Sequence, residues 1–131
     1  MRLLVDTHIV LWRMTASPRL PAQAVELLDA PENTLEVSVA SIWEVAVKHG
    51  LPGKGRQVMP VSGKNFLRDV RAVGIEPLSI SAQHAVEVDR LPPFHRDPFD
   101  RLLVAQARSE SMHLLTHDAQ LAAYGDFVIV V

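Results

Sequence analysis

Short apolar runs alternate with longer stretches of helical periodicity along the whole chain. Nearly continuous apolar runs are typical of buried strands, and apolar positions recurring every three or four residues are typical of helices. Strands are expected at residues 3–5, 35–39, 75–80, 112–115 and 127–131. Helices are expected at residues 7–14, 21–30, 41–49, 62–73, 81–91, 97–109 and 118–124. This alternation predicts an α/β fold with a mainly parallel sheet that is covered by helices on both faces.

Glycine and proline residues mark the ends of several of these elements. Gly50 and Gly74 each follow an expected helix, as residues just past a helix end often do. Pro77 interrupts the apolar run at 75–80, so we expect that strand to be short or to lie at an edge of the sheet. The segment 51–60 is rich in glycine and proline and is expected to be a loop.

Composition narrows the class of protein. The chain has 131 residues and no cysteine, which suits a single domain over residues 1–131 and excludes a disulfide scaffold or a thiolate zinc site. The 13 basic and 15 acidic residues give a net charge of −2. Contact with nucleic acid would therefore depend on a local basic patch or on metal ions. No apolar stretch reaches the roughly 20 residues that span a bilayer, so a cytoplasmic protein without membrane contact is expected.

Carboxylates recur where expected strands end and the following helices begin. Asp6 directly follows the first strand, and Glu44 lies near the start of the helix after the second. Asp97 and Asp100 lie at the start of the helix expected at 97–109, and Asp118 follows the strand expected at 112–115. Strand ends and the helix starts after them share one edge of a parallel sheet, where ligands bind. We therefore expect these side chains to converge.

Each acid also has a purely structural interpretation as a helix cap. Ser41 and Glu44 have the spacing of a capping box, and Asp97 precedes a proline that suits the first position of a helix. Asp6 and Asp118 could each cap the helix that follows. Several carboxylates at one edge, however, would repel and raise each other's pKa unless a cation lay between them. Oxygen ligands without cysteine favour Mg²⁺ or Mn²⁺.

Four segments contain these acids: LLVDTH at 3–8, SIWE at 41–44, HRDPFDRLLVAQA at 95–107 and LLTHD at 114–118. Together, in this order, they resemble the PIN-domain nucleases and, more narrowly, the VapC-type toxins of bacterial toxin–antitoxin pairs. The resemblance implies an α/β/α sandwich around a mainly parallel sheet of four to five strands. It also implies a Mg²⁺- or Mn²⁺-dependent endoribonuclease that hydrolyses RNA with a metal-activated water.

The resemblance implies roles for particular residues. The catalytic residues would be Asp6, Glu44, Asp97, Asp100, Thr116 and Asp118. The metal ligands among them would be Asp6, Glu44, Asp100 and Asp118, with Asp97 as a further contributor. Thr116 would support the site by donating a hydrogen bond to a carboxylate or to a metal-bound water. The number of ions stays open, as does the choice between Asp97 and Asp100 as the main ligand of their motif.

Basic and imidazole side chains lie near the acids in the sequence. The candidates for contact with the RNA backbone are Arg96, Arg101, Lys54 and Arg56. Arg96 and Arg101 could instead pair with neighbouring acids, and the basic stretch between residues 48 and 71 could be a solvated surface. The histidines nearest the acids are His8, His95 and His117. We expect these to have surface or supporting roles rather than to bind metal.

Partners and alternative functions complete the expectations. The resemblance implies a homodimer and an antitoxin that lays a segment into a groove near the site. Leu11, Trp12 and Met14 could form an exposed apolar patch for a partner. One alternative is a non-catalytic Mg²⁺-binding module for regulation or partner docking. Another is a metal-dependent phosphohydrolase with Asp6 as nucleophile, although the second acid expected two residues later is missing.

Overall fold

A sheet of four parallel strands forms the centre of the structure, a computed structural model that describes residues 1–51 and 59–131. The strands are β1 (Arg2–Val5), β2 (Thr34–Glu36), β3 (His113–Thr116) and β4 (Val128–Val130). Their order across the sheet is β2-β1-β3-β4, so β1 and β3 are the central pair. In register, Leu4 of β1 lies opposite Glu36 on one side and Leu114 on the other.

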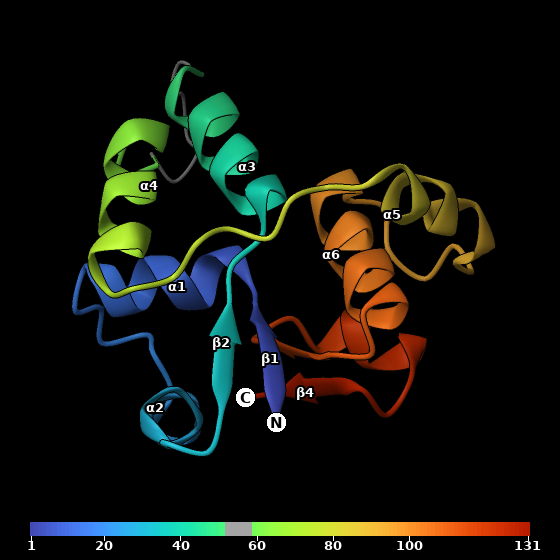
Figure 1. The fold of residues 1–131 in the computed structure, drawn as a ribbon, viewed down its shortest axis with the longest axis horizontal. Coiled ribbons are helices and arrows are strands. Elements are labelled where there is room, and N and C mark those ends of the chain that lie inside the picture. The colour runs from blue at the N-terminus through green and yellow to red at the C-terminus, as the bar shows by residue number, and fades with distance from the viewer. Residues whose placement is uncertain (52–58) are drawn as a thin grey trace.

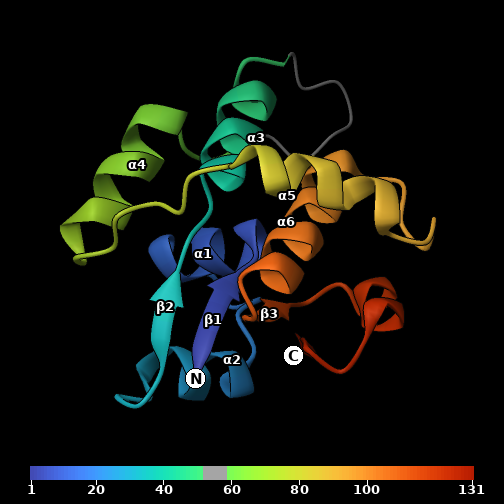
Figure 2. The same ribbon diagram turned by 45° about the vertical axis from the view of Figure 1, so that its right-hand side comes forward.

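Helices connect the strands and cover both faces of the sheet (Figures 1 and 2). The α-helices are α1 (Thr7–Met14), α2 (Ala22–Asp29), α3 (Val39–His49), α4 (Gly63–Ala72), α5 (Ala82–Glu87) and α6 (Pro98–Ser109). The 3-10 helices are η1 (Val88–Arg90) and η2 (Ala119–Tyr124). Within residues 1–51 and 59–131, no helix combines the length and the apolar character that a membrane crossing needs. The predicted α/β/α sandwich with a parallel sheet is confirmed.

The sheet separates two hydrophobic cores, because successive strand residues point to opposite faces. Leu4 and Leu114 pack with Leu103 of α6 on one face. Val5 and Leu115 pack with Phe66 of α4 and with the apolar side of α1 on the other face. Each fully buried aliphatic side chain of this kind stabilises the fold by about 1.5–3 kcal/mol. The two cores hold the strand ends, and the acids beyond them, in place.

The strand predicted at 75–80 does not form, and that prediction was wrong. A single bridge replaces it, in which the Leu78 N–H donates to the Val37 carbonyl at 2.8 Å and the Val39 N–H donates to the Leu78 carbonyl at 2.9 Å. Pro77 has no N–H to continue such a ladder. The sheet therefore has four strands, the lower end of the expected number.

Helix α3 begins at Val39 rather than at residue 41. Its N-cap is Ser38, whose hydroxyl accepts a hydrogen bond from the Ala40 N–H at 2.9 Å. Ser41 is therefore inside the helix, where its hydroxyl accepts a hydrogen bond from Thr7. The capping-box interpretation of Ser41 and Glu44 is wrong, and the Glu44 side chain is free of any role at the helix start.

The remaining differences concern short segments. The helix predicted at 81–91 ends at Glu87 and continues as η1, and the one predicted at 118–124 is the 3-10 helix η2. Helix α4 begins at Gly63, where an added Cβ would lie 2.8 Å from the Ala46 side chain of α3. The absence of a side chain thus allows α3 and α4 to approach closely. The loop predicted at 51–60 falls largely on residues 52–58, outside the described residues.

Candidate active site at the carboxyl edge of the sheet

The acids that the sequence singled out converge where β1 and β3 end. Asp6 follows β1 and is 3% exposed, and Glu44 on α3 is 2% exposed. Asp97 and Asp100 lie at the start of α6, and Asp118 follows β3. All four other carboxylates act on Asp100, since each raises its pKa through charge repulsion. The structure therefore brings the five predicted acids together.

Asp6 is a buried carboxylate with one oxygen in a hydrogen bond and one free. Its Oδ2 accepts a hydrogen bond of 2.6 Å from the Thr116 hydroxyl. Its Oδ1 is buried and has no hydrogen-bond partner among the described residues. Burial raises the pKa of Asp6, and the hydrogen bond from Thr116 and the nearby His8 lower it in part. Asp6 makes no side-chain cap bond to α1, so its interpretation as a helix cap was wrong.

Glu44 has the same arrangement on α3. Its Oε2 accepts a hydrogen bond from the Lys48 ammonium one helical turn later, and its buried Oε1 has no partner in the described part of the chain. Burial alone would lower the pKa of Lys48, but the hydrogen bond and charge of Glu44, with the charges of Asp97 and Asp100, raise it. The ammonium also lies 5.8 Å from the centre of the Phe99 ring. A lysine cation therefore already partly balances the acidic cluster.

Asp100 is a second acid, after Asp6, whose charge is unfavourable in this site. Its side chain is only 14% exposed. Burial, followed by repulsion from Asp6, Asp97, Glu44 and Asp118, raises the pKa of Asp100 from 3.8 to about 8. Without a further cation, this carboxyl therefore holds a proton near neutral pH. A divalent ion among these oxygens would offset the repulsion and favour the ionised form.

Asp97 and Asp118 both cap helices, as the structural interpretation predicted. Asp97 Oδ1 accepts hydrogen bonds from the N–H groups of Phe99 at 2.8 Å and Asp100 at 3.4 Å. Asp118 Oδ1 accepts a hydrogen bond of 2.9 Å from the Gln120 N–H. Capping uses one oxygen of each carboxylate. Of the two acids in the third motif, Asp100 is the one without a capping role.

His95 and Lys48 are the side chains whose place in the site the sequence did not assign. His95 Nε2 lies 2.7 Å from Asp118 Oδ2 and 3.6 Å from Asp100 Oδ2. One ligand atom from each of these three residues lies within 4.8 Å of the others, a spacing that could hold a metal ion. For Lys48, the signal in the sequence was its spacing of four residues from Glu44, which is that of a helical ion pair.

The predicted RNA-binding residues have different fates. The Arg101 guanidinium donates to the carbonyls of Val88 at 3.3 Å and Leu91 at 3.2 Å, which secures η1 against α6. Arg96 is exposed beside the cluster. Lys54 and Arg56 lie outside the described residues. For Arg101, the geometry favours a structural role over the predicted contact with RNA.

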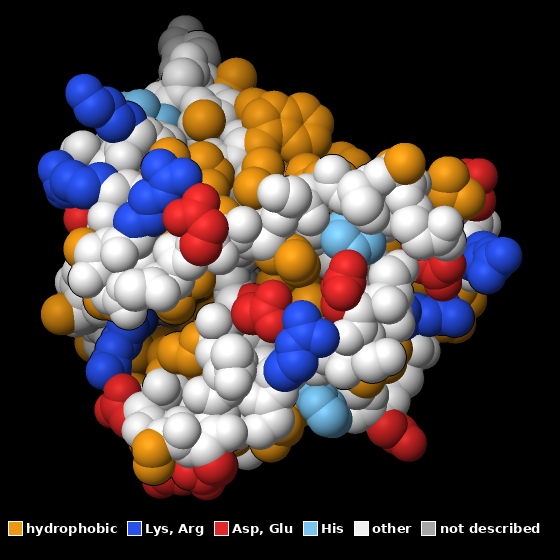
Figure 3. All heavy atoms as spheres, viewed as in Figure 1, with side chains coloured by type: hydrophobic (Ala, Val, Ile, Leu, Met, Phe, Trp, Pro, Cys, Tyr) orange, Lys and Arg blue, Asp and Glu red, His pale blue; other side chains and the backbone are white. Residues whose placement is uncertain are grey.

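The basic stretch between residues 48 and 71 is largely paired. Arg68 forms an ion pair with Asp69, and Arg71 forms one with Glu76. Figure 3 shows lysine and arginine side chains gathered over α4, with an acidic side chain among them. This pairing favours the interpretation of a solvated surface for Arg68 and Arg71, whereas Lys48 binds Glu44 in the acidic cluster.

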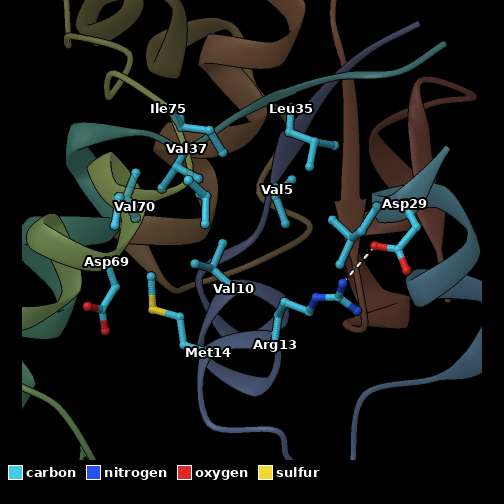
Figure 4. A pocket seen from close by; sticks show the side chains of 13 residues that line it. Val5, Val10, Arg13, Met14, Asp29, Leu35, Val37, Asp69, Val70 and Ile75 are labelled. Carbon is cyan, nitrogen blue, oxygen red and sulfur yellow. Dashed lines mark hydrogen bonds and ion pairs between the residues drawn. The ribbon is translucent and has the colours of Figure 1, made fainter. Parts of the chain in front are cut away.

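An apolar groove lies on the face of the sheet covered by α1 and α4 (Figure 4), and none of the five clustered acids lines it. Its volume is about 520 Å³, and its lining includes Val5, Val10, Met14 and Ile75. The ion pair between Arg13 and Asp29 lies at the side of the groove. The predicted exposed patch of Leu11, Trp12 and Met14 was wrong, because Leu11 is buried in the core and the other two are half-buried against it.

Comparisons with known proteins agree with this architecture. A family model described as the PIN domain matches residues 3–126. Among solved structures, the fold is similar to a chain in the crystal structure of VapBC2 from Rickettsia felis bound to a DNA fragment from their promoter. That match has a TM-score of 0.68 and 20% sequence identity, and covers 100% of this chain and 98% of that one. The comparison with curated proteins finds no match. Because the family model spans nearly the whole chain, the protein belongs to the PIN-domain family.

Proposed function

We propose that this protein is a Mg²⁺- or Mn²⁺-dependent endoribonuclease and the VapC-type toxin of a toxin–antitoxin pair. PIN domains are typically nucleases, and they generally use divalent metals. The observation that carries the proposal is the pair of buried, unpartnered oxygens on Asp6 and Glu44 beside Asp100. Burying carboxylates is costly unless their oxygens are satisfied, so a cation that contacts these two open oxygens would stabilise the site. An all-oxygen donor set suits the hard ions Mg²⁺ and Mn²⁺.

The proposed donors suit such an ion in their chemistry, whereas the ligand atoms that lie within 4.8 Å of one another among the described residues are those of His95, Asp100 and Asp118. Asp6 through Oδ1, Glu44 through Oε1 and the Asp100 carboxylate would hold it, with Asp118 completing the site. When bound, a divalent ion activates a water for in-line attack on phosphorus and offsets charge on the phosphoryl oxygens. Asp97 keeps the first turn of α6 in place through its cap bonds, which positions Asp100.

The other side chains of the site orient these acids. The Thr116 hydroxyl holds Asp6 Oδ2, which leaves Oδ1 as the open oxygen. Lys48 shares Glu44 with any bound ion and lowers the net negative charge that an RNA phosphate would meet. Arg101 is held by backbone carbonyls. Arg96 is exposed beside the cluster, and it can contact that phosphate.

The toxin role implies an antitoxin that restrains the nuclease. The similar solved structure is described as VapBC2, which supports a partner of this kind. The lining of the apolar groove of about 520 Å³ includes Val5, the residue before Asp6, but none of the five acids of the cluster. An antitoxin segment could lie in this groove, on the face of the sheet that α1 and α4 cover. Its apolar side chains would fill the groove next to Val10 and Met14.

A homodimer is also part of the proposal. Trp43, Val47 and Leu51 recur every four residues and are 56%, 40% and 50% exposed. Figure 3 shows hydrophobic surface beside α3. Such a stripe is stabilised when a second copy covers it. Light scattering after gel filtration should give the mass of a dimer, and Trp43→Ser with Val47→Ser should give a monomer. A monomeric wild-type protein would contradict the homodimer.

A cleavage assay tests the nuclease directly. Purified protein is incubated with labelled structured and single-stranded RNAs in Mg²⁺, in Mn²⁺ and in EDTA. We expect cleavage that needs the metal and that Asp100→Asn abolishes. The matched control is Asp126→Asn, which removes an exposed carboxylate away from the cluster. Cleavage by Asp100→Asn at the wild-type rate would refute the assignment of the site.

Other outcomes distinguish the alternative functions. Mg²⁺ binding that is lost in Asp100→Asn, without cleavage of any RNA, would favour the non-catalytic regulatory or docking module. Hydrolysis of phosphomonoesters through a phosphorylated Asp6 would favour the phosphohydrolase. Absence of both metal binding and cleavage would leave the acids with structural roles only.

A further inference from the structure

A continuous chain of hydrogen bonds runs from the start of α6 to the open carboxylate at the end of β1. The Asp97 backbone N–H donates to His95 Nδ1 at 3.1 Å. His95 Nε2 meets Asp118 Oδ2 at 2.7 Å. The Asp118 N–H donates to the Thr116 hydroxyl oxygen at 3.0 Å, and that hydroxyl donates to Asp6 Oδ2 at 2.6 Å. The chain thus links three of the four acidic motifs.

The first link fixes the tautomer of His95. A backbone N–H can only donate, so Nδ1 must accept and carries no proton. In the neutral ring the proton is then on Nε2, which donates to the Asp118 carboxylate. Turning the ring by half a turn would put carbon atoms at both positions and lose both hydrogen bonds. The contacts on either side of the ring therefore agree on one orientation and one tautomer.

We propose that His95 is a positioning residue that orients Asp118 by donating from Nε2, and that it is not a metal ligand. Its Nε2 lies close enough to Asp100 and Asp118 to suggest a mixed imidazole and carboxylate site. Ligation needs a lone pair on Nε2, and the proton would then have to move to Nδ1. The Nδ1 proton would then face the Asp97 N–H. Two donors would point at each other, so the hydrogen bond between Asp97 and Nδ1 would be lost and replaced by repulsion. The proposal rests on the proposed nuclease site.

Orientation of Asp118 has a consequence at Asp6. With Oδ2 held by His95 and Oδ1 held by the Gln120 N–H, the Asp118 carboxylate has both oxygens in hydrogen bonds. Its backbone N–H in turn occupies a lone pair of the Thr116 oxygen, so the hydroxyl hydrogen points to Asp6. His95 thereby helps to keep the Asp6 Oδ1 atom open toward the cluster.

The tautomer can be measured without any catalytic assay. Two-bond ¹H–¹⁵N correlation spectra of the full-length protein labelled at histidine nitrogen distinguish the Nε2–H form from the Nδ1–H form. The His95 signals are assigned as those absent from His95→Gln. We expect the Nε2–H form without metal and the same form at saturating Mg²⁺. A His95 that shows the Nδ1–H form, or that loses its Nε2 proton when Mg²⁺ is added, would overturn the proposal.

Two conservative variants show whether His95 acts as a hydrogen-bond donor, as a metal ligand or only as a packed side chain. The glutamine amide nitrogen can occupy the position of Nε2 and donate to Asp118, whereas asparagine reaches only as far as Nδ1. We expect His95→Asn to lower kcat for RNA cleavage by about tenfold or more, and His95→Gln to recover most of that loss. Calorimetry should give a smaller loss of Mg²⁺ affinity for either variant than for Asp100→Asn, since neither variant removes a ligand.

The two proposals fail in different ways. A His95→Asn variant that loses Mg²⁺ affinity as strongly as Asp100→Asn would show that His95 is a ligand, and would leave the nuclease in place. Equal losses of kcat in both variants would show that a donor at Nε2 is not what matters. If the wild-type protein cleaves no RNA, the nuclease proposal fails, and the spectra alone decide the tautomer of His95.

Discussion

The gain in stability that Asp100→Asn gives the metal-free protein over wild type should be larger at high pH than at low pH. In the folded protein, burial and repulsion from neighbouring acids raise the pKa of Asp100 from 3.8 to about 8. The folded state therefore binds this proton more tightly than the unfolded chain does. Stability is lost as pH rises above 3.8, and the loss is complete once pH exceeds about 8. Asparagine has no such proton and removes this dependence.

The size of the effect follows from the same values. Each pH unit between the two pKa values lowers the free energy of unfolding by about 1.4 kcal/mol. Between pH 5 and pH 8, wild type should lose about 3–4 kcal/mol that Asp100→Asn does not lose. For a domain of this length, that corresponds to roughly 10 °C in the melting temperature. Divalent ions should reverse the loss in wild type, because they replace the proton in offsetting the repulsion.

Urea unfolding of the two proteins in EDTA at pH 5 and pH 8 measures the effect, since urea adds no ionic screening. Asp126→Asn serves as the matched control and should follow wild type at both values, because this carboxylate is exposed. Saturating Mg²⁺ at pH 8 should stabilise wild type far more than Asp100→Asn. The reasoning is refuted if the difference between wild type and Asp100→Asn is the same at pH 5 and pH 8.

Three further perturbations test other parts of the structure. Lys48→Met should lower the metal-free free energy of unfolding by about 1–3 kcal/mol, since buried Glu44 loses its partner, and should raise Mg²⁺ affinity in calorimetry. Arg101→Met should cost about 1–3 kcal/mol in urea unfolding without changing Mg²⁺ affinity, because its guanidinium bonds to backbone carbonyls; a large loss of RNA affinity in the folded variant would instead support the predicted contact with RNA. Gly63→Ala should lower stability by about 1–3 kcal/mol through overpacking against α3, and Gly50→Ala, whose new Cβ meets nothing closer than 3.7 Å, should not show this loss.

Much of the fold could be predicted from local sequence patterns. The apolar runs at β1 and β3 and the periodicity of α6 identified those elements, because such patterns depend on residues a few positions apart. The position of the acids after β1 and β3 followed from the common edge of a parallel sheet. Two of the wrong predictions also have causes in the local sequence. Pro77 reduced one expected strand to a bridge, and Ser38 moved the start of α3.

Local patterns of residues therefore predicted the fold class and the set of acids that meet. The role of each acid depends on contacts between distant parts of the chain. Asp6 and Thr116 are 110 residues apart in the chain, and their hydrogen bond decides which oxygen of Asp6 stays open. Lys48, which was expected on a basic surface, lies in the acidic cluster. The physical reason is that hydrogen bonds and desolvation depend on orientation over a few ångström, which residue type and spacing along the chain do not specify.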